Sequence, residues 1–118
     1  MANENIQTDP LFLALVNEDI EPFNELRDQG KTCDFSHASF RGFDFRGAKL
    51  EGLNFYGAYM RNTDLRGLDL TNVNIEAASI REAKVSGTFF PKAIHPQEIM
   101  MSLKRGTRLR YSITSEHS

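Results

Sequence analysis

Large apolar residues recur at every fifth position through the middle of this 118-residue chain. Counting by fives meets twelve apolar residues without exception: Phe35, Phe40, Phe45, Leu50, Phe55, Met60, Leu65, Leu70, Ile75, Ile80, Val85 and Phe90. A helix repeats its faces every 3.6 residues and a flat strand every two, so neither element explains a period of five. The period predicts a chain that turns a corner once per repeat, with these twelve residues in its core.

A second, mostly small or apolar set lies two residues before each of the twelve and is expected to face the same interior. Glycine recurs two residues after the large apolar residue, for example at Gly47 and Gly52, where it permits a turn. Three members of the second set, Phe43, Leu53 and Leu68, are bulky. We expect local widening, or a side chain turned outward, at their corners.

The units ASFRG, FDFRG, AKLEG, LNFYG and TDLRG resemble the pentapeptide-repeat family, and the resemblance covers about half of the chain. It implies a right-handed β-helix of square cross-section with four pentapeptides per coil, and so about three coils here. The expected fold class is therefore all-β: a right-handed quadrilateral β-helix capped by short α-helices at both ends. The helix and basic tail after the repeats also resemble small bacterial members of the family.

The flanks predict those helices within a single domain. In residues 1–30, Asp9 is expected to cap a helix that begins at Pro10, and Asp19 a second helix that stops near Gly30. Residues 31–90 form the repeat body. In residues 91–118, a helix is expected to open near Pro96 and to end at Gly106, before a basic tail.

The net charge of −2 is unevenly distributed, because residues 1–30 hold seven acids and one base while residues 91–118 hold five bases and two acids. The repeat body between them is almost neutral. No apolar run is long enough to span a membrane and the start lacks a signal-peptide pattern, so a cytoplasmic protein is expected. The single cysteine, Cys33, occupies an inward position and is read as a small buried hydrophobe.

We expect neither an enzyme nor a cofactor, because a β-helix filled by its own side chains leaves no cavity where catalytic groups converge. The spacing of His37, His95 and His117 matches no metal signature. An Asp or Asn precedes the central apolar residue in six repeats: Asp34, Asp44, Asn54, Asp64, Asp69 and Asn74. Such side chains bond readily to nearby backbone in turns, so they are predicted to form corners rather than catalytic pairs.

Arginines provide the candidate binding surface. Arg41, Arg61 and Arg81 are twenty residues apart and should stack on one face, with Arg46 and Arg66 on the adjoining face. Like charges about 5 Å apart repel by about 1 kcal/mol even in water, so such an edge favours a partner with negative charge. The alternative is internal pairing, since an Asp follows three residues after Arg41 and after Arg61.

Two further features point to protein contacts. Tyr56 and Tyr59 are expected to lie outward, and exposed aromatic residues can anchor a partner. Leu109, Tyr111 and Ile113 alternate along the C-terminal segment, which predicts a short strand. That strand would either form a homodimer through the C-terminal region or pack on its own domain.

The sequence favours a noncatalytic scaffold or protein–protein interaction module with an unidentified protein partner. The family resemblance implies an alternative, DNA mimicry that modulates DNA gyrase or another type II topoisomerase, which the near-neutral and short repeat body disfavours. Weak nucleic-acid binding is a third hypothesis, in which the arginine edge acts with the basic residues Lys104, Arg105, Arg108 and Arg110. The pI of about 5.9 makes nucleic acid a poor candidate.

Overall fold

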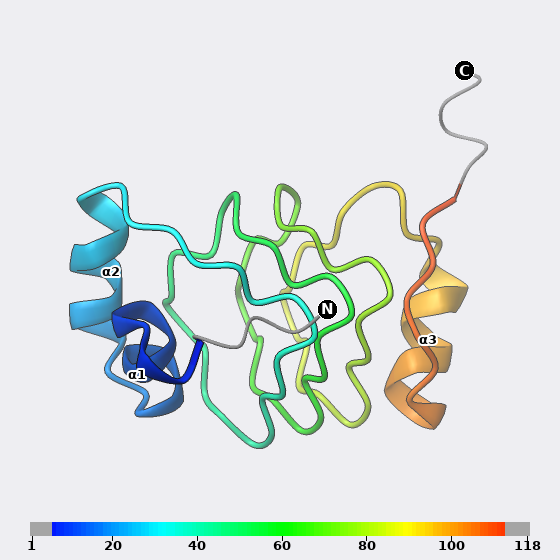
Figure 1. The fold of residues 1–118 in the computed structure, drawn as a ribbon. Helices are drawn as coiled ribbons and strands as arrows, with labels where there is room; N and C mark the ends of the chain where they lie inside the picture. Colours follow the sequence, from blue (N-terminus) through cyan, green and yellow to red (C-terminus); the bar gives the residue numbers. More distant parts are fainter. Residues whose placement is uncertain (1–5, 113–118) are drawn as a thin grey trace.

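A repeat body lies between two helical ends in the computed structural model, which describes residues 6–112 (Figure 1). A 3₁₀ helix η1 (Ile6–Thr8) precedes helices α1 (Pro10–Val16) and α2 (Ile20–Asp28) at one end. Helix α3 (Pro96–Arg105) lies at the other end. The chain between α2 and α3 winds in stacked coils that contain no helix.

One coil is twenty residues long, because the parallel bridges between neighbouring coils join residues twenty apart. The bridges form four rows: Asp34–Asn54–Asn74, Ser39–Tyr59–Ser79, Asp44–Asp64–Lys84 and Asp69–Phe89. They are isolated bridges rather than extended strands. A turn at every fifth residue leaves each side of the coil too short for a strand, so the all-β description is not confirmed as a conventional sheet.

The corners are hydrogen-bonded turns. In the turn after Phe45, the carbonyl of Phe45 accepts a hydrogen bond from the N–H of Ala48 at 3.0 Å. Gly47 adopts a φ of +82° in this turn. Non-glycine residues take the same left-handed conformation at four corners: His37, Asn62, Ala77 and Glu82. The chain therefore keeps its path where the glycine of the repeat is replaced.

The short polar residues before the central position support these corners. Oδ1 of Asp44 accepts a hydrogen bond from the N–H of Arg46 at 3.0 Å. The same bond to the N–H two residues later is made by Asp34, Asn54, Asp64, Asp69 and Asn74. The six residues thus act in the turns, as expected, and do not form a set of free carboxylates.

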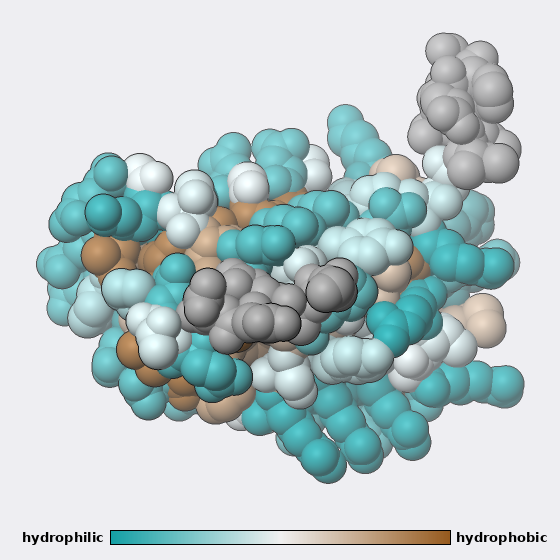
Figure 2. Space-filling model, viewed as in Figure 1, coloured by the Kyte–Doolittle hydropathy of each residue, from teal (hydrophilic) through white to brown (hydrophobic). Residues whose placement is uncertain are grey.

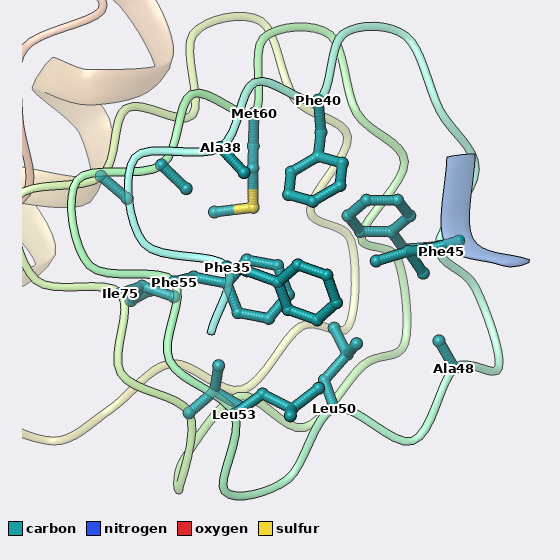
Figure 3. Packing of buried hydrophobic residues seen from close by; sticks show 14 of the residues in the cluster. Phe35, Ala38, Phe40, Phe45, Ala48, Leu50, Leu53, Phe55, Met60 and Ile75 are labelled. Atoms are coloured by element: carbon teal, nitrogen blue, oxygen red, sulfur yellow. The ribbon is translucent and has the colours of Figure 1, made fainter. Parts of the chain in front are cut away.

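The twelve central residues face the interior. Ten of them are buried, while Val85 and Phe90 in the last coil are only partly buried. Figure 3 shows the rings of Phe35 and Phe55 overlapping in the core, with Ile75 next to them. The rings of Phe35 and Phe55 stack with centroids 5.0 Å apart. Residues twenty apart therefore pack on one another through successive coils.

Only one of the three bulky residues in the second set is partly turned to the surface. Leu53 and Leu68 are buried at 2% and 7% exposure, whereas Phe43 is half-buried and packs edge-on against Phe40. The carbonyl of Phe40 accepts a hydrogen bond from the hydroxyl of Thr63 at 3.3 Å. At the corner after Phe40, a side-chain hydroxyl from the next coil thus bonds to the carbonyl, whereas at the corner after Phe45 a backbone N–H three residues later does so.

Both helical ends bond to the backbone of the coil they contact. The side chain of Asn24 in α2 donates to Gly47 O at 2.9 Å and accepts from Lys49 N at 2.8 Å. At the other end, the hydroxyl of Ser102 in α3 accepts a hydrogen bond from Ile80 N at 3.0 Å. Side chains and helices thus satisfy backbone groups that have no further coil to pair with.

The helix boundaries follow local sequence signals with one exception. Asp9 accepts a hydrogen bond from Leu11 N at 2.8 Å, and α1 begins at Pro10. Helix α3 begins at Pro96 and ends before Gly106, whose φ is +73°. Asp19 precedes α2 but makes no side-chain capping bond, so the predicted cap there is wrong.

Candidate interaction site at the arginine row

Arg41, Arg61 and Arg81 occupy the same corner in three successive coils, and we call them the arginine row. Backbone hydrogen bonds hold this corner in register, from Gly42 N to Arg61 O at 2.9 Å and from Asn62 N to Arg81 O at 2.8 Å. Paired backbones lie about 4.7 to 4.9 Å apart. All three side chains are exposed, so three positive charges rise along one edge.

Arg46 and Arg66 on the adjoining face are paired within the chain. The carboxylate of Asp44 lies 2.8 Å from Arg46, and that of Asp64 lies 2.7 Å from Arg66. The hydrogen bond from Arg66 lowers the pKa of Asp64 to about 2, and that from Arg46 lowers the pKa of Asp44. These two arginines therefore form compact ion pairs and not an open cationic edge.

The arginine row itself is not neutralised in this way. Arg41 and Arg81 form no ion pair with another residue in the described range, and Arg61 lies 3.7 Å from Glu82. The alternative of internal pairing with Asp44 and Asp64 therefore holds for Arg46 and Arg66 but not for the arginine row. The reason is local: the bond from the carboxylate to the backbone two residues ahead directs each Asp toward the following arginine, away from the preceding one.

A cleft of about 310 Å³ lies beside the arginine row. Its lining includes the three arginines of the row and Arg105. It also includes the three residues joined by one row of bridges: Ser39, Tyr59 and Ser79. None of its described lining residues is acidic. Four arginine residues thus line one small concave surface.

The end of α3 positions the fourth arginine of this cleft. Arg105 is the last residue of α3, and the left-handed turn at Gly106 follows it. The Ser79 hydroxyl donates to Gly106 O at 2.9 Å, which fixes the helix end against the coil. A Cβ at position 106 would lie 3.1 Å from Cδ of Arg81, so glycine allows Arg81 to pack closely there.

The two candidate tyrosines lie in different surroundings. Tyr59 is 45% exposed, and the Arg108 guanidinium lies 4.7 Å from the centre of its ring while also donating to its hydroxyl. Tyr56 lies on the preceding face, with the ring of His37 edge-on at 5.6 Å. Tyr59 is therefore a fixed wall of the cleft, and Tyr56 is outside it.

The C-terminal segment packs on its own repeat body as far as the structure describes it. Leu109 is fully buried and exchanges backbone hydrogen bonds with Ala77 and Ala78. Tyr111 forms an antiparallel bridge with Ile94, and its hydroxyl accepts from Ile75 N. Ile113 lies outside the described residues. Homodimer formation through this region stays a prediction.

Cys33 and the histidines show no reactive arrangement in the described part of the chain. Burial raises the pKa of the Cys33 thiol to about 12, with Asp9 adding to the effect, so the thiolate is strongly disfavoured. Residues 6–112 contain no group of three His, Cys, Asp or Glu side chains that could hold a metal ion. His117 lies outside this range.

The outer surface is mostly hydrophilic over the repeat body in the view of Figure 2, and apolar surface gathers near the α1–α2 end. Exposed apolar side chains include Leu13 in α1, Met100 and Met101 in α3, and Phe89 in the last coil. None of the helices in the described range has the length and apolar character needed to cross a membrane.

The family model for pentapeptide repeats matches eight copies, over residues 33–67 and 58–94. These matches span more than half of the chain and coincide with the coils. The chain belongs to the pentapeptide-repeat family. No curated protein and no solved structure gave a significant match. Membership in this family implies a right-handed β-helix. The bridges between residues twenty apart agree with its four pentapeptides per coil.

Sequence reasoning grouped Arg105 and Arg108 with the arginine edge only as part of a basic tail, and it did not predict that Arg105 lines the cleft or that Arg108 contacts Tyr59. The order of residues predicts that α3 stops at Gly106, but it does not predict which coil the following segment contacts. The available signal was the alternation of Leu109 and Tyr111, which left open whether that segment would pack on its own domain. The backbone bonds of Leu109 to the 77–78 corner decide this.

Proposed function

We propose that this pentapeptide-repeat protein is a noncatalytic interaction module that binds the acidic surface of a folded protein partner at the arginine row. The observation that carries the proposal is the contrast between neighbouring arginines. Arg46 and Arg66 have close Asp partners, while Arg41 and Arg81 have none among the described residues. An exposed row of like charges does not stabilise the fold, and an acidic partner would relieve its repulsion.

The interior supports a noncatalytic role. The buried side chains form one hydrophobic cluster that runs through the coils. The polar residues Asp34, Asp44 and Asp69 bond to backbone N–H groups at their own turns. Such a rigid body presents flat faces that bind by shape and charge.

We also propose that the helical ends act as caps. The ends of a stack of coils would otherwise offer unpaired backbone groups to another chain. Asn24 and Arg27 of α2 bond to the 47–51 segment of the first coil. Ser102 and Leu103 of α3 bond to Ile80 and Glu82 of the last coil. These contacts favour a chain that does not extend by end-to-end stacking.

Modulation of a type II topoisomerase by DNA mimicry remains the alternative that the family suggests. Mimicry would require an acidic face, whereas the acids of the 44–64 rung are paired with arginines. Direct nucleic-acid binding is the third candidate, and its affinity would fall steeply with salt because phosphate contacts release counterions. Recovery of topoisomerase subunits or of nucleic acid in the experiment below would favour these alternatives.

The test is affinity capture of partners from cytoplasmic extract, the expected compartment, with the wild-type chain and the triple variant Arg41→Gln, Arg61→Gln and Arg81→Gln. The matched control replaces the exposed residues Lys31, Lys84 and Lys92 by Gln, which removes the same charge elsewhere. We expect one acidic protein to be captured by the wild type and the control but lost from the arginine variant. Equal capture by all three chains would refute docking at the arginine row.

A further inference from the structure

We propose that the cleft beside the arginine row binds a small ligand that carries a chain of linked phosphate groups. Arg41, Arg61 and Arg81 line it from three successive coils, and Arg105 lines it from the end of α3. The only acidic side chain paired with any of these four among the described residues is Glu82, 3.7 Å from Arg61. The cleft therefore holds an excess of positive charge that a polyanion would neutralise.

The spacing of the row selects among anions. Neighbouring arginines of the row follow the coil spacing of about 4.7 to 4.9 Å, whereas same-face side chains of an extended peptide recur about every 6.6 to 6.8 Å. An acidic peptide crossing the coils would soon lose register with the guanidinium groups. Linked phosphates place charged oxygens at short intervals along the ligand, and each planar guanidinium can bind two of them.

The walls of the cleft also favour a compact ligand. Its volume of about 310 Å³ is at the lower end of the range of about 300 to 1,000 Å³ typical of small-molecule sites. The exposed residue Ser39 adds a hydroxyl that can donate to a phosphate oxygen. Tyr59, held by Arg108, forms an aromatic wall beside the charged groups.

Helix α3 also fixes this site. Gly106 follows Arg105 directly, and its carbonyl accepts a hydrogen bond from the hydroxyl of Ser79, which also lines the cleft. The arginines of the row are held by the backbone ladder at 42–61 and 62–81. Backbone positions of all four arginines are thus fixed before any ligand arrives, which reduces the ordering that binding requires.

The inference goes beyond protein docking and can fail independently of it, because the purified full chain tests it without any protein partner. Isothermal titration would measure binding of inorganic tripolyphosphate, with orthophosphate and sulfate compared at matched ionic strength. We expect saturable 1:1 binding of tripolyphosphate that is at least about tenfold tighter than that of either single anion, because several arginines act together.

Variants then locate the site. Replacing Arg41 and Arg81 by Gln should weaken tripolyphosphate binding at least about tenfold per arginine, since hydrogen bonds between charged groups are among the strongest. The Lys31, Lys84 and Lys92 control should change the affinity by less than about threefold, because long-range charge is screened. If the double Gln variant does not fold, Arg41→Lys with Arg81→Lys keeps the charges while removing the planar fork, and a weakening of at least about threefold is expected.

Titration with ATP, a nucleoside triphosphate, tests whether the cleft binds the phosphate chain alone or also contacts a nucleoside. Binding of ATP equal to that of tripolyphosphate indicates recognition of the phosphate chain alone, and tighter binding indicates an added contact of the nucleoside, for which Tyr59 is the nearest aromatic wall. Both results support the proposal. Absence of saturable binding, equal affinity for sulfate, or equal loss in the arginine and lysine variants would overturn it.

Discussion

In six repeats the Asp or Asn before the central apolar residue accepts a hydrogen bond from the backbone N–H two residues later. This bond closes the turn and also sets the direction of the side chain. In Asp44 and Asp64 it directs the second carboxylate oxygen to the arginine that follows. A turn-forming interaction therefore decides which arginines are neutralised and which remain open.

The first prediction concerns Asp64, whose side chain is mostly buried beside Arg66. Because its pKa is lower in the folded chain than in the unfolded one, its contribution to stability is complete above about pH 4 and is lost as the pH falls toward 2. Asp64→Asn keeps an oxygen for the turn, as Asn54 and Asn74 do. We expect it to reduce the free energy of unfolding by on the order of 1 to 2 kcal/mol at pH 7.

Urea unfolding of both chains from pH 7 to pH 2 measures this. The difference between wild type and Asp64→Asn should shrink as the pH falls. Asp69→Asn is the control, because Asp69 bonds to Thr71 and has no arginine partner in the described structure. A difference for Asp64→Asn that stayed constant over the whole range would show that the ion pair does not account for its effect.

The second prediction concerns Gly57 and Gly52, which share a left-handed conformation but differ in their surroundings. Gly52→Ala meets open space, so its cost is that of the backbone alone, about 1 to 2 kcal/mol. Gly57→Ala would place a Cβ 2.6 Å from Nδ1 of His37, which must then leave its edge-on contact with Tyr56. Thermal or urea unfolding should show an extra loss of about 0.5 to 1.5 kcal/mol for Gly57→Ala. Equal losses would mean that the contact between His37 and Tyr56 does not contribute measurably to the free energy of unfolding.

At the scale of elements, the repeat body and its helical ends depend on different kinds of information. The five-residue period predicts the core columns, since register alone places residues twenty apart on one another. The bonds of α2 and α3 to the coils could not be predicted, because they depend on how each helix is oriented against a coil. Asp19 illustrates the limit: its position before a helix predicts a cap, yet no capping bond forms there.

The third prediction concerns Ser102, the fully buried residue of α3 whose hydroxyl accepts from Ile80 N. Ser102→Ala leaves a buried backbone N–H without a partner and should reduce the free energy of unfolding by about 1 to 3 kcal/mol. Met101→Ala, at a 44% exposed position of the same helix, is the matched control and should cost less than about 1 kcal/mol. Denaturant unfolding of both variants compares them. Similar losses in the two would contradict a specific bond between α3 and the last coil.

In the molecule as a whole, some arginines form ion pairs within the chain, while those of the arginine row remain exposed without a close Asp partner among residues 6–112. The sequence shows that Arg41, Arg61 and Arg81 share one corner, and the coils place them there. It could not show that the nearby acids belong to Arg46 and Arg66, because spacing defines columns and not side-chain directions. Nor could it show that α3 brings Arg105 to the same cleft. The stacking of the arginine row is therefore predictable from the sequence, whereas the cleft beside it depends on how α3 packs against the coils.

We expect the arginine row to oppose folding while it remains open to a negatively charged partner, and the stability of two matched double variants at different salt concentrations tests this expectation. Arg41→Gln with Arg81→Gln removes both neighbours of Arg61 and should raise the free energy of unfolding by on the order of 1 kcal/mol at about 0.01 M salt. Arg46→Gln with Arg66→Gln removes two ion pairs and should lower it. Both differences should diminish near 1 M salt, where the Debye length falls to about 3 Å. A loss of stability in the Arg41 and Arg81 variant that is largest at low salt would contradict the account, because it would place the row within the internal charge balance of the fold.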